Sequence, residues 1–215
     1  MINTRRLRCT IGWLGMLLPW IVLLMSIIYG YGFPDSISAT YYIPTCITPF
    51  MIILGSAGLL LFSYKGYDRH DDMICSVAGV FGIGICLFSC GTKDLIAVWP
   101  ELGELVGVGT FQIIPFVSGV LHNVCAIGFF GLLAYNSMCL FTKSGGEMTE
   151  SKKKRNVIFR VCGVGMVASF LAIIPISIFN WWGGIWIVET IALAFFGISW
   201  LTKANCYPWL FADKK

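Results

Sequence analysis

Charged residues and histidines are scarce in this sequence, and each shortage excludes a class of protein. Only 12% of the 215 residues are charged, and the mean hydropathy is +0.81. Soluble domains are about one quarter charged, and a fold of this size could not bury so much apolar surface in water. No long polar stretch is present that could fold separately. We therefore expect residues 1–215 to form one membrane domain.

Familiar catalytic and metal-binding signatures are also missing. The sequence contains no C-x-x-C pair, no G-x-S-x-G elbow, no phosphate-binding glycine loop and no H-E-x-x-H motif. Its nine cysteines form no ligand cluster with His70 or His122, so we expect neither a metal nor a cofactor. Cysteine is a small apolar residue that membrane helices accept easily. A disulfide between Cys46 and Cys90 stays open, because both could lie near one surface.

Six long apolar runs are what the sequence does contain. Each approaches the roughly 20 residues that a helix needs to cross a bilayer. The runs cover about 11–30, 46–64, 73–90, 113–141, 157–179 and 184–201. They predict an all-α integral membrane bundle of six transmembrane helices. The first run follows three arginines, as in a signal peptide, but it is long and no A-x-A-like cleavage site follows, so we expect a retained helix.

Basic residues orient these six spans. With both termini on one side, that side carries 14 of the 15 lysines and arginines, and only Lys93 lies on the other. Because cytoplasmic loops of membrane proteins are rich in lysine and arginine, we expect both termini in the cytoplasm, most simply at a plasma (inner) membrane. The run Lys152–Arg155 is expected to rest on anionic lipid headgroups. This membrane setting excludes a nucleic-acid partner.

Two ionisable residues interrupt the apolar runs. Glu189 lies about 10 Å below Trp182, and His122 lies about 13 Å below Ile113, at 1.5 Å per helical residue. Both helices run inward in the expected topology, so the two side chains fall at similar depth. Ionisable groups at such depth are costly and commonly functional. The alternative is a His–Glu pair that only holds two helices together.

Other polar residues are expected near the same mouth. Ser118 precedes His122 by one helical turn and should lie on the same face of its helix. The segments that flank the second and third spans add hydroxyls, carboxylates and one lysine. The predicted ligand-binding set is therefore Ser118, His122, Glu189, Asp35, Ser36, Ser38, Tyr41, Tyr42, Lys93 and Asp94. His122, Glu189 and Ser118 are also the candidates for acid–base chemistry.

Several segments carry a resemblance to known membrane families. The FPDSIS segment before the second span and the fourth span with His122-Asn123 and Phe129-Phe130 resemble the six-span Frag/DRAM superfamily. With YKGYD at Tyr64–Asp68 and ETIALAFFGISWLTK at Glu189–Lys203, the chain is also similar to bacterial six-span families of unknown function. The superfamily's paired prolines are replaced by Tyr41-Tyr42-Ile43-Pro44. The resemblance implies a role in lipid remodelling or membrane trafficking, without a defined catalytic residue.

A second, shorter resemblance concerns a metal. Ser118-x-x-x-His122 is similar to one piece of the motif in alkaline ceramidase-like membrane hydrolases, which use three metal-binding histidines. This chain has only His70 and His122, and the expected topology puts them on opposite faces of the membrane. A zinc hydrolase is therefore excluded by the number of ligands.

Three functions remain open at this stage. The first is a multi-pass protein with an outward-facing polar pocket for a lipid headgroup or small ligand. The second is a membrane-embedded lipid-modifying enzyme that uses His122 and Glu189. The third is an oligomeric channel or transporter, although the inner halves of the fourth and sixth spans are almost wholly apolar. Membrane lipids are the expected partners. Copies of the chain could also pair through small residues, namely Ala78, Gly79, Gly82, Gly84, Gly163, Gly165, Ala168 and Ser169.

Overall fold

Six long helices make up most of the chain in the computed structural model, which describes residues 4–90, 115–144, 146 and 148–207. All six are long and apolar enough to cross a membrane. They are α1 (Thr4–Ile28), α2 (Pro44–Phe62), α3 (Arg69–Leu87), α5 (Pro115–Tyr135), α6 (Glu150–Ile178) and α7 (Gly184–Lys203). Two short elements accompany them, the 3₁₀ helix η1 (Ser38–Tyr42) and the π-helical turn η3 (Asn136–Leu140). The prediction of an all-α fold with six such helices is confirmed.

Helix ends differ from the apolar runs mainly where polar residues cap or extend a helix. α1 begins at Thr4 and α6 at Glu150, each seven positions before the apolar run. Lysine and arginine are good helix formers, so a helix continues through basic segments that hydropathy assigns to loops. Thr149 caps α6 by accepting a hydrogen bond from the Lys152 amide. Hydropathy therefore locates the spans but not their polar first turns.

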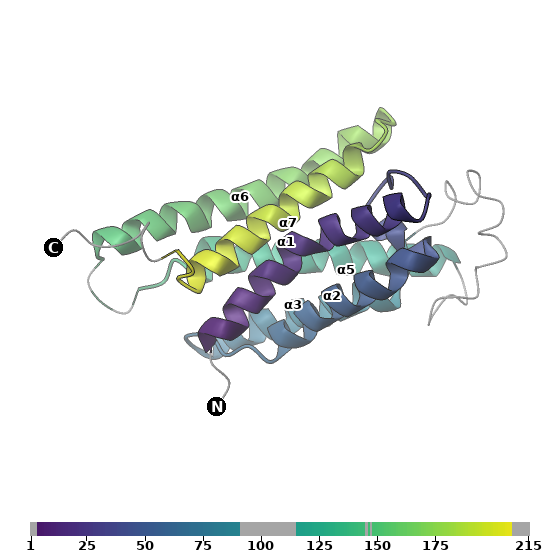
Figure 1. Ribbon diagram of the computed structural model, residues 1–215. Coiled ribbons are helices and arrows are strands. Elements are labelled where there is room, and N and C mark those ends of the chain that lie inside the picture. Colours follow the sequence, from purple (N-terminus) through teal and green to yellow (C-terminus); the bar gives the residue numbers. More distant parts are fainter. Residues whose placement is uncertain (1–3, 91–114, 145, 147, 208–215) are drawn as a thin grey trace.

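The helices form a closed ring in which each packs against its neighbour in the chain and α7 returns to α1 (Figure 1). We call the end where α1 and α6 begin and α7 finishes the basic end, and the opposite end the cavity end. Every lysine and arginine that the structure describes lies in the half nearer the basic end. These are Arg5, Arg6, Arg8, Lys65, Arg69, Lys143, Lys152, Lys153, Lys154, Arg155, Arg160 and Lys203.

Aromatic side chains fill the axis of the ring between the two ends. Phe129 of α5 meets Phe196 of α7 with ring centroids 6.3 Å apart, and Trp200 lies 6.2 Å from Phe196. All three are at most 1% exposed. Large buried aromatic rings contribute strongly to packing, and here they separate the cavity end from the basic end.

Glycines bring helix backbones into direct contact. A Cβ at Gly79 of α3 would lie 2.5 Å from the Gly58 carbonyl oxygen of α2, and one at Gly197 of α7 would lie 2.8 Å from the Gly12 oxygen of α1. Gly163 of α6 likewise brings its helix close to the backbone of a neighbouring helix. The small residues thus serve packing inside one chain, and the pairing of copies through them stays a prediction.

One disulfide joins the two ends of the described chain. It links Cys9 in α1 to Cys206 just after α7. The disulfide between Cys46 and Cys90 that the sequence left open does not form, since both residues are free thiols. Cys46 lies in the first turn of α2 and is buried against α1, where its thiol donates to the Val22 carbonyl at 3.4 Å.

Candidate functional site

A cavity of about 650 Å³ lies at the cavity end, between α5, α6, α7 and the segment that leads into η1. Its lining has a polar part and an apolar part. One part is polar, formed by Ser36, Ser38, Cys90, His122, Asn123, Ser177 and Glu189. The other part is apolar, formed by Ala126, Ile127, Phe170, Leu171, Ile173, Ile174 and Ile185. In Figure 1, the α6–α7 pair diverges from the other helices toward this end.

Glu189 projects from the second turn of α7 toward the segment before η1. Its Oε2 accepts a hydrogen bond from the Ile37 backbone N–H at 2.5 Å. The backbone N–H and hydroxyl of Ser38 also face the same carboxylate. Amide donors satisfy a carboxylate that would otherwise be costly among apolar helices. Glu189 therefore holds the η1 segment against α7 and also lines the cavity.

His122 projects from α5 and is 4% exposed. Its Nδ1 lies 2.8 Å from the Phe88 carbonyl oxygen, and its Nε2 lies 3.1 Å from Ser38 Oγ. A carbonyl can only accept, so Nδ1 carries the hydrogen in the neutral ring, and Nε2 then accepts from the Ser38 hydroxyl. The Phe88 contact thus fixes the orientation of the ring.

Ser38 stands between the two ionisable residues. Its hydroxyl bonds to His122 on one side and faces Glu189 on the other. Within the described chain, no hydrogen bond or ion pair joins His122 directly to Glu189. Both residues line the cavity, but Ser38 lies between them in place of the direct His–Glu pair that was the alternative. Sequence depth alone could not show this, because the bridging serine comes from a loop far from both helices.

The other candidate residues fall into different surroundings. Ser36 lines the cavity together with Ser38. Ser118 is absent from the lining and bonds instead to the hydroxyl and carbonyl of Ser89, at 3.2 and 3.1 Å. The carboxyl-bearing Asp35 is exposed, and its backbone oxygen accepts from the Trp186 amide at 3.0 Å. Lys93 and Asp94 lie outside the described residues.

The two tyrosines of η1 serve packing next to the site. Tyr42 donates a hydrogen bond to the Cys90 carbonyl at 2.5 Å, and burial raises the pKa of its phenol, which stays a donor. Tyr41 packs edge-on against Tyr42 and Phe50, with centroids 5.5 and 6.3 Å away. Neither lines the cavity. Both hold the segment that carries Ser36 and Ser38.

Sequence reasoning missed part of the lining. Asn123 and Ser177 contribute polar groups, and Phe170 and Leu171 contribute apolar wall. The adjacency of Asn123 to His122 was a usable signal. The apolar wall on α6 gave no such signal, because its residues resemble ordinary lipid-facing positions in the sequence. A second, narrower space of about 50 Å³ shares Ser38, Phe170 and Glu189 with the cavity and is lined mostly by apolar groups deeper in the ring.

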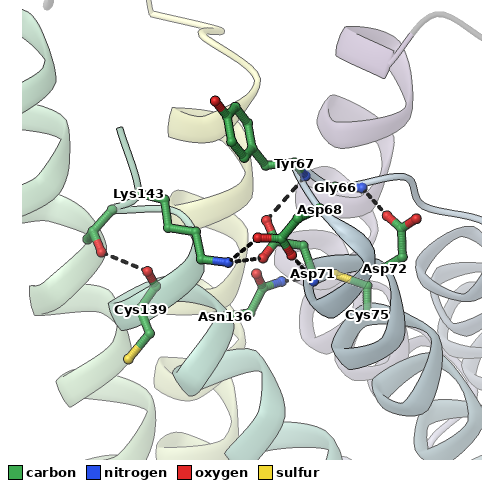
Figure 2. Close-up of polar contacts among 10 residues, drawn as sticks. Gly66, Tyr67, Asp68, Asp71, Asp72, Cys75, Asn136, Cys139 and Lys143 are labelled. Carbon is green, nitrogen blue, oxygen red and sulfur yellow. Dashed lines mark hydrogen bonds and ion pairs between the residues drawn. The ribbon is translucent and has the colours of Figure 1, made fainter. Parts of the chain in front are cut away.

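A separate polar cluster lies at the basic end (Figure 2). The Lys143 ammonium bonds to Asp68 at 2.8 Å and to Asp71 at 2.6 Å, linking the segment after η3 to the start of α3. The Lys143 ammonium lowers the pKa of Asp68 to about 2. His70 and the two aspartates could group around a cation, but the ammonium already occupies both carboxylates. This cluster links the segment after η3 to the start of α3, and we assign no metal site to it.

Similarity to known proteins adds no further constraint. The chain matches no family model, no curated protein and no solved structure.

Proposed function

We propose that this is an integral membrane protein whose basic end faces the cytoplasm and whose cavity opens toward the opposite half of a plasma membrane. The concentration of basic residues at one end supports this orientation. Large apolar side chains that project outward from the helices support insertion, among them Trp20, Leu24, Ile52, Leu59 and Val164.

We propose further that the cavity binds an outer-leaflet lipid. The observation that carries this is the two-sided lining, in which the polar group around Ser38, His122 and Glu189 adjoins a continuous apolar wall on α5 and α6. A headgroup would lie at the polar part and an acyl chain along Phe170 and Ile174. Sites of this volume that combine apolar walls with a few placed polar groups are typical of small-ligand pockets.

The chemistry of the lining favours a headgroup with amine or hydroxyl donors. No lysine or arginine occurs among the lining residues that the structure describes, whereas the Glu189 carboxylate and several hydroxyl and amide oxygens can accept. A polyol headgroup would satisfy these acceptors, and an ammonium headgroup would in addition balance the negative charge of Glu189. A second anionic group beside Glu189 would be repelled.

Thermal unfolding in neutral detergent tests this proposal. Short-chain phosphatidylethanolamine should raise the melting temperature of the wild type more than short-chain phosphatidylglycerol does. Glu189→Gln should lose the difference, and Glu150→Gln, the same change on an exposed residue at the basic end, should keep it. Equal responses to both lipids, or a difference that survives Glu189→Gln, would contradict the proposal.

A membrane-embedded enzyme is the second candidate, because of one contact. Ser38 Oγ and His122 Nε2 are 3.1 Å apart, and the Phe88 carbonyl orients the ring. This is the geometry of a nucleophile beside its base. The sequence alone suggested an enzyme that uses His122 and Glu189, and these contacts add Ser38 as the hydroxyl beside His122. A fluorophosphonate that labels wild type but neither Ser38→Ala nor His122→Ala would support it, and labelling that survives Ser38→Ala would oppose it.

The channel or transporter alternative gains no support from the described part of the ring. Transport needs a polar path between the two ends, and Phe129, Phe196 and Trp200 occupy the axis there. A pore between several copies would need a surface that no contact in the chain identifies.

A further inference from the structure

We propose that Arg8, Lys152, Arg155 and Lys203 at the basic end form a binding site for a phosphate group. The four residues come from α1 and α6, which begin at the basic end, and from α7, which finishes there (Figure 1). Arg8, Lys152 and Arg155 all lie within electrostatic range of the Lys203 ammonium. This site is distinct from the lipid cavity and does not depend on it.

Three of the four side chains, those of Arg8, Lys152 and Lys203, lie over aromatic rings, unlike ordinary solvated basic residues. Lys203 Nζ lies 4.8 Å from the Phe141 ring centroid, and Lys152 Nζ lies 5.7 Å from that of Phe159. The Arg8 guanidinium lies 5.5 Å over the Tyr64 ring. Cation–π contacts of this kind hold a positive charge in place without neutralising it. All four are partly buried, whereas Lys153 and Lys154 are exposed.

Hydrogen-bond donors remain unused at this cluster. Lys152 donates to the Phe141 carbonyl at 2.8 Å, and Arg8 donates to the Tyr64 hydroxyl at 3.2 Å. Within the described chain, Lys203 and Arg155 donate no hydrogen bond, and the Arg155 Nε is buried without a partner. Lysine and arginine carry three and five donors, so most of the donor capacity of the cluster faces no protein acceptor.

The acidic residues nearby are already engaged. Asp71 is the acidic group within electrostatic range of Lys203, and its carboxylate bonds to Lys143 at 2.6 Å and to the Tyr67 amide at 3.2 Å. Glu150, on the same helix as Lys152, pairs with the exposed Lys153 at 2.7 Å. Among the residues that the structure describes, four like charges are therefore close together with no carboxylate of their own.

A phosphate group fits this imbalance. It presents several acceptor oxygens with negative charge, and it would accept from guanidinium and ammonium donors while relieving the repulsion among them. The ligand chemistry has two sources, a phospholipid headgroup in the adjacent leaflet or free phosphate. The aromatic floor and the position at helix ends suit either one.

Thermal unfolding of the full chain in neutral detergent tests the site. Sodium phosphate is compared with sodium chloride at equal ionic strength, and dihexanoyl phosphatidic acid with dihexanoyl phosphatidylcholine. The wild type should show a saturating rise in melting temperature with phosphatidic acid, with phosphate, or with both. A response to the lipid alone identifies a headgroup site, and a response to both identifies a general phosphate site.

Variants separate this site from general basic charge. Lys203→Met and Lys152→Met should each weaken the apparent affinity by about tenfold or more, whereas Lys154→Met should leave it within about twofold. Without phosphate, Lys203→Met should melt at or above the wild type, because one source of repulsion is gone. A wild type that responds to neither phosphate nor phosphatidic acid would overturn the proposal, as would equal losses in Lys154→Met and Lys203→Met. Should either methionine variant fail to fold, Lys203→Arg must fold and retain binding.

Discussion

Glu189 and Ile37, 152 positions apart in the chain, are joined by a 2.5 Å hydrogen bond from the Ile37 amide to the Glu189 carboxylate. This contact gives an ionisable residue of a membrane-type helix a specific structural partner. It also places Ser38, the next residue, within reach of His122. The carboxylate therefore shapes the cavity as well as lining it.

Two substitutions at Glu189 should separate these roles. Glu189→Leu leaves the Ile37 N–H without its acceptor and should destabilise the protein by about 1–3 kcal/mol, the cost of an unpaired buried donor. Glu189→Gln keeps an acceptor oxygen and should lose little stability while losing amine-headgroup binding. Chemical unfolding in mixed micelles measures the first effect, and lipid-induced thermal shifts measure the second. If the two variants behaved alike in both measurements, the carboxylate would have only one role.

Reporter fusions measure the orientation of the protein in the membrane. Fusions after Lys215 and within residues 144–151 should both report a cytoplasmic location, because the basic residues gather at that end. An external signal from either position would reverse the proposed topology.

The redox state of Cys9 and Cys206 provides a second test of the same topology. Disulfides are rare in the cytosol, so with the basic end inside we expect two thiols in intact cells. A membrane-permeant maleimide added before lysis should label both, and the bond should form only after exposure to air. Protection of both thiols in living cells would favour the opposite orientation.

Low pH should destabilise the basic end of the protein. The folded pKa of Asp68 is about 2, below its ordinary value of 3.8, so its contribution to stability is present above pH 3.8 and is lost as the pH falls toward 2. The melting temperature should therefore drop across this window. Lys143→Met removes the cause and should flatten that part of the curve, and Lys154→Met should leave its slope unchanged.

Glycine substitutions should show where backbones touch. An alanine Cβ at Gly79 would lie 2.5 Å from one backbone atom of α2 and 2.6 Å from another, so Gly79→Ala should destabilise by about 1–3 kcal/mol. The exposed Gly131 has no atom within 4 Å of an added Cβ. Gly131→Ala should raise stability by about 0.5–1 kcal/mol through helix propensity. Unfolding free energies in one detergent make the comparison, and equal losses would oppose close α2–α3 packing.

The sequence could predict the helices but only part of the cavity. Apolar runs of bilayer length leave few alternatives to helix, and depth matching was enough to select His122 and Glu189 as candidates. The sequence could not predict how each helix is rotated about its own axis. Ser118 shares a face with His122, yet one turn along the helix its hydroxyl bonds to Ser89 and does not line the cavity. The Ser38 bridge depends on how a loop folds back, which helical periodicity does not encode.

The contact between Gly12 and Gly197 has a consequence for biosynthesis. The first helix to leave the ribosome packs against the last, so the ring cannot close until α7 is complete. At 5–20 residues per second, that wait is roughly ten to forty seconds. Throughout this interval one flank of α1 has only lipid or the insertion machinery beside it. A chain that stops short of α7 loses that helix and also leaves α1 with α2 as its one lasting neighbour in the described ring.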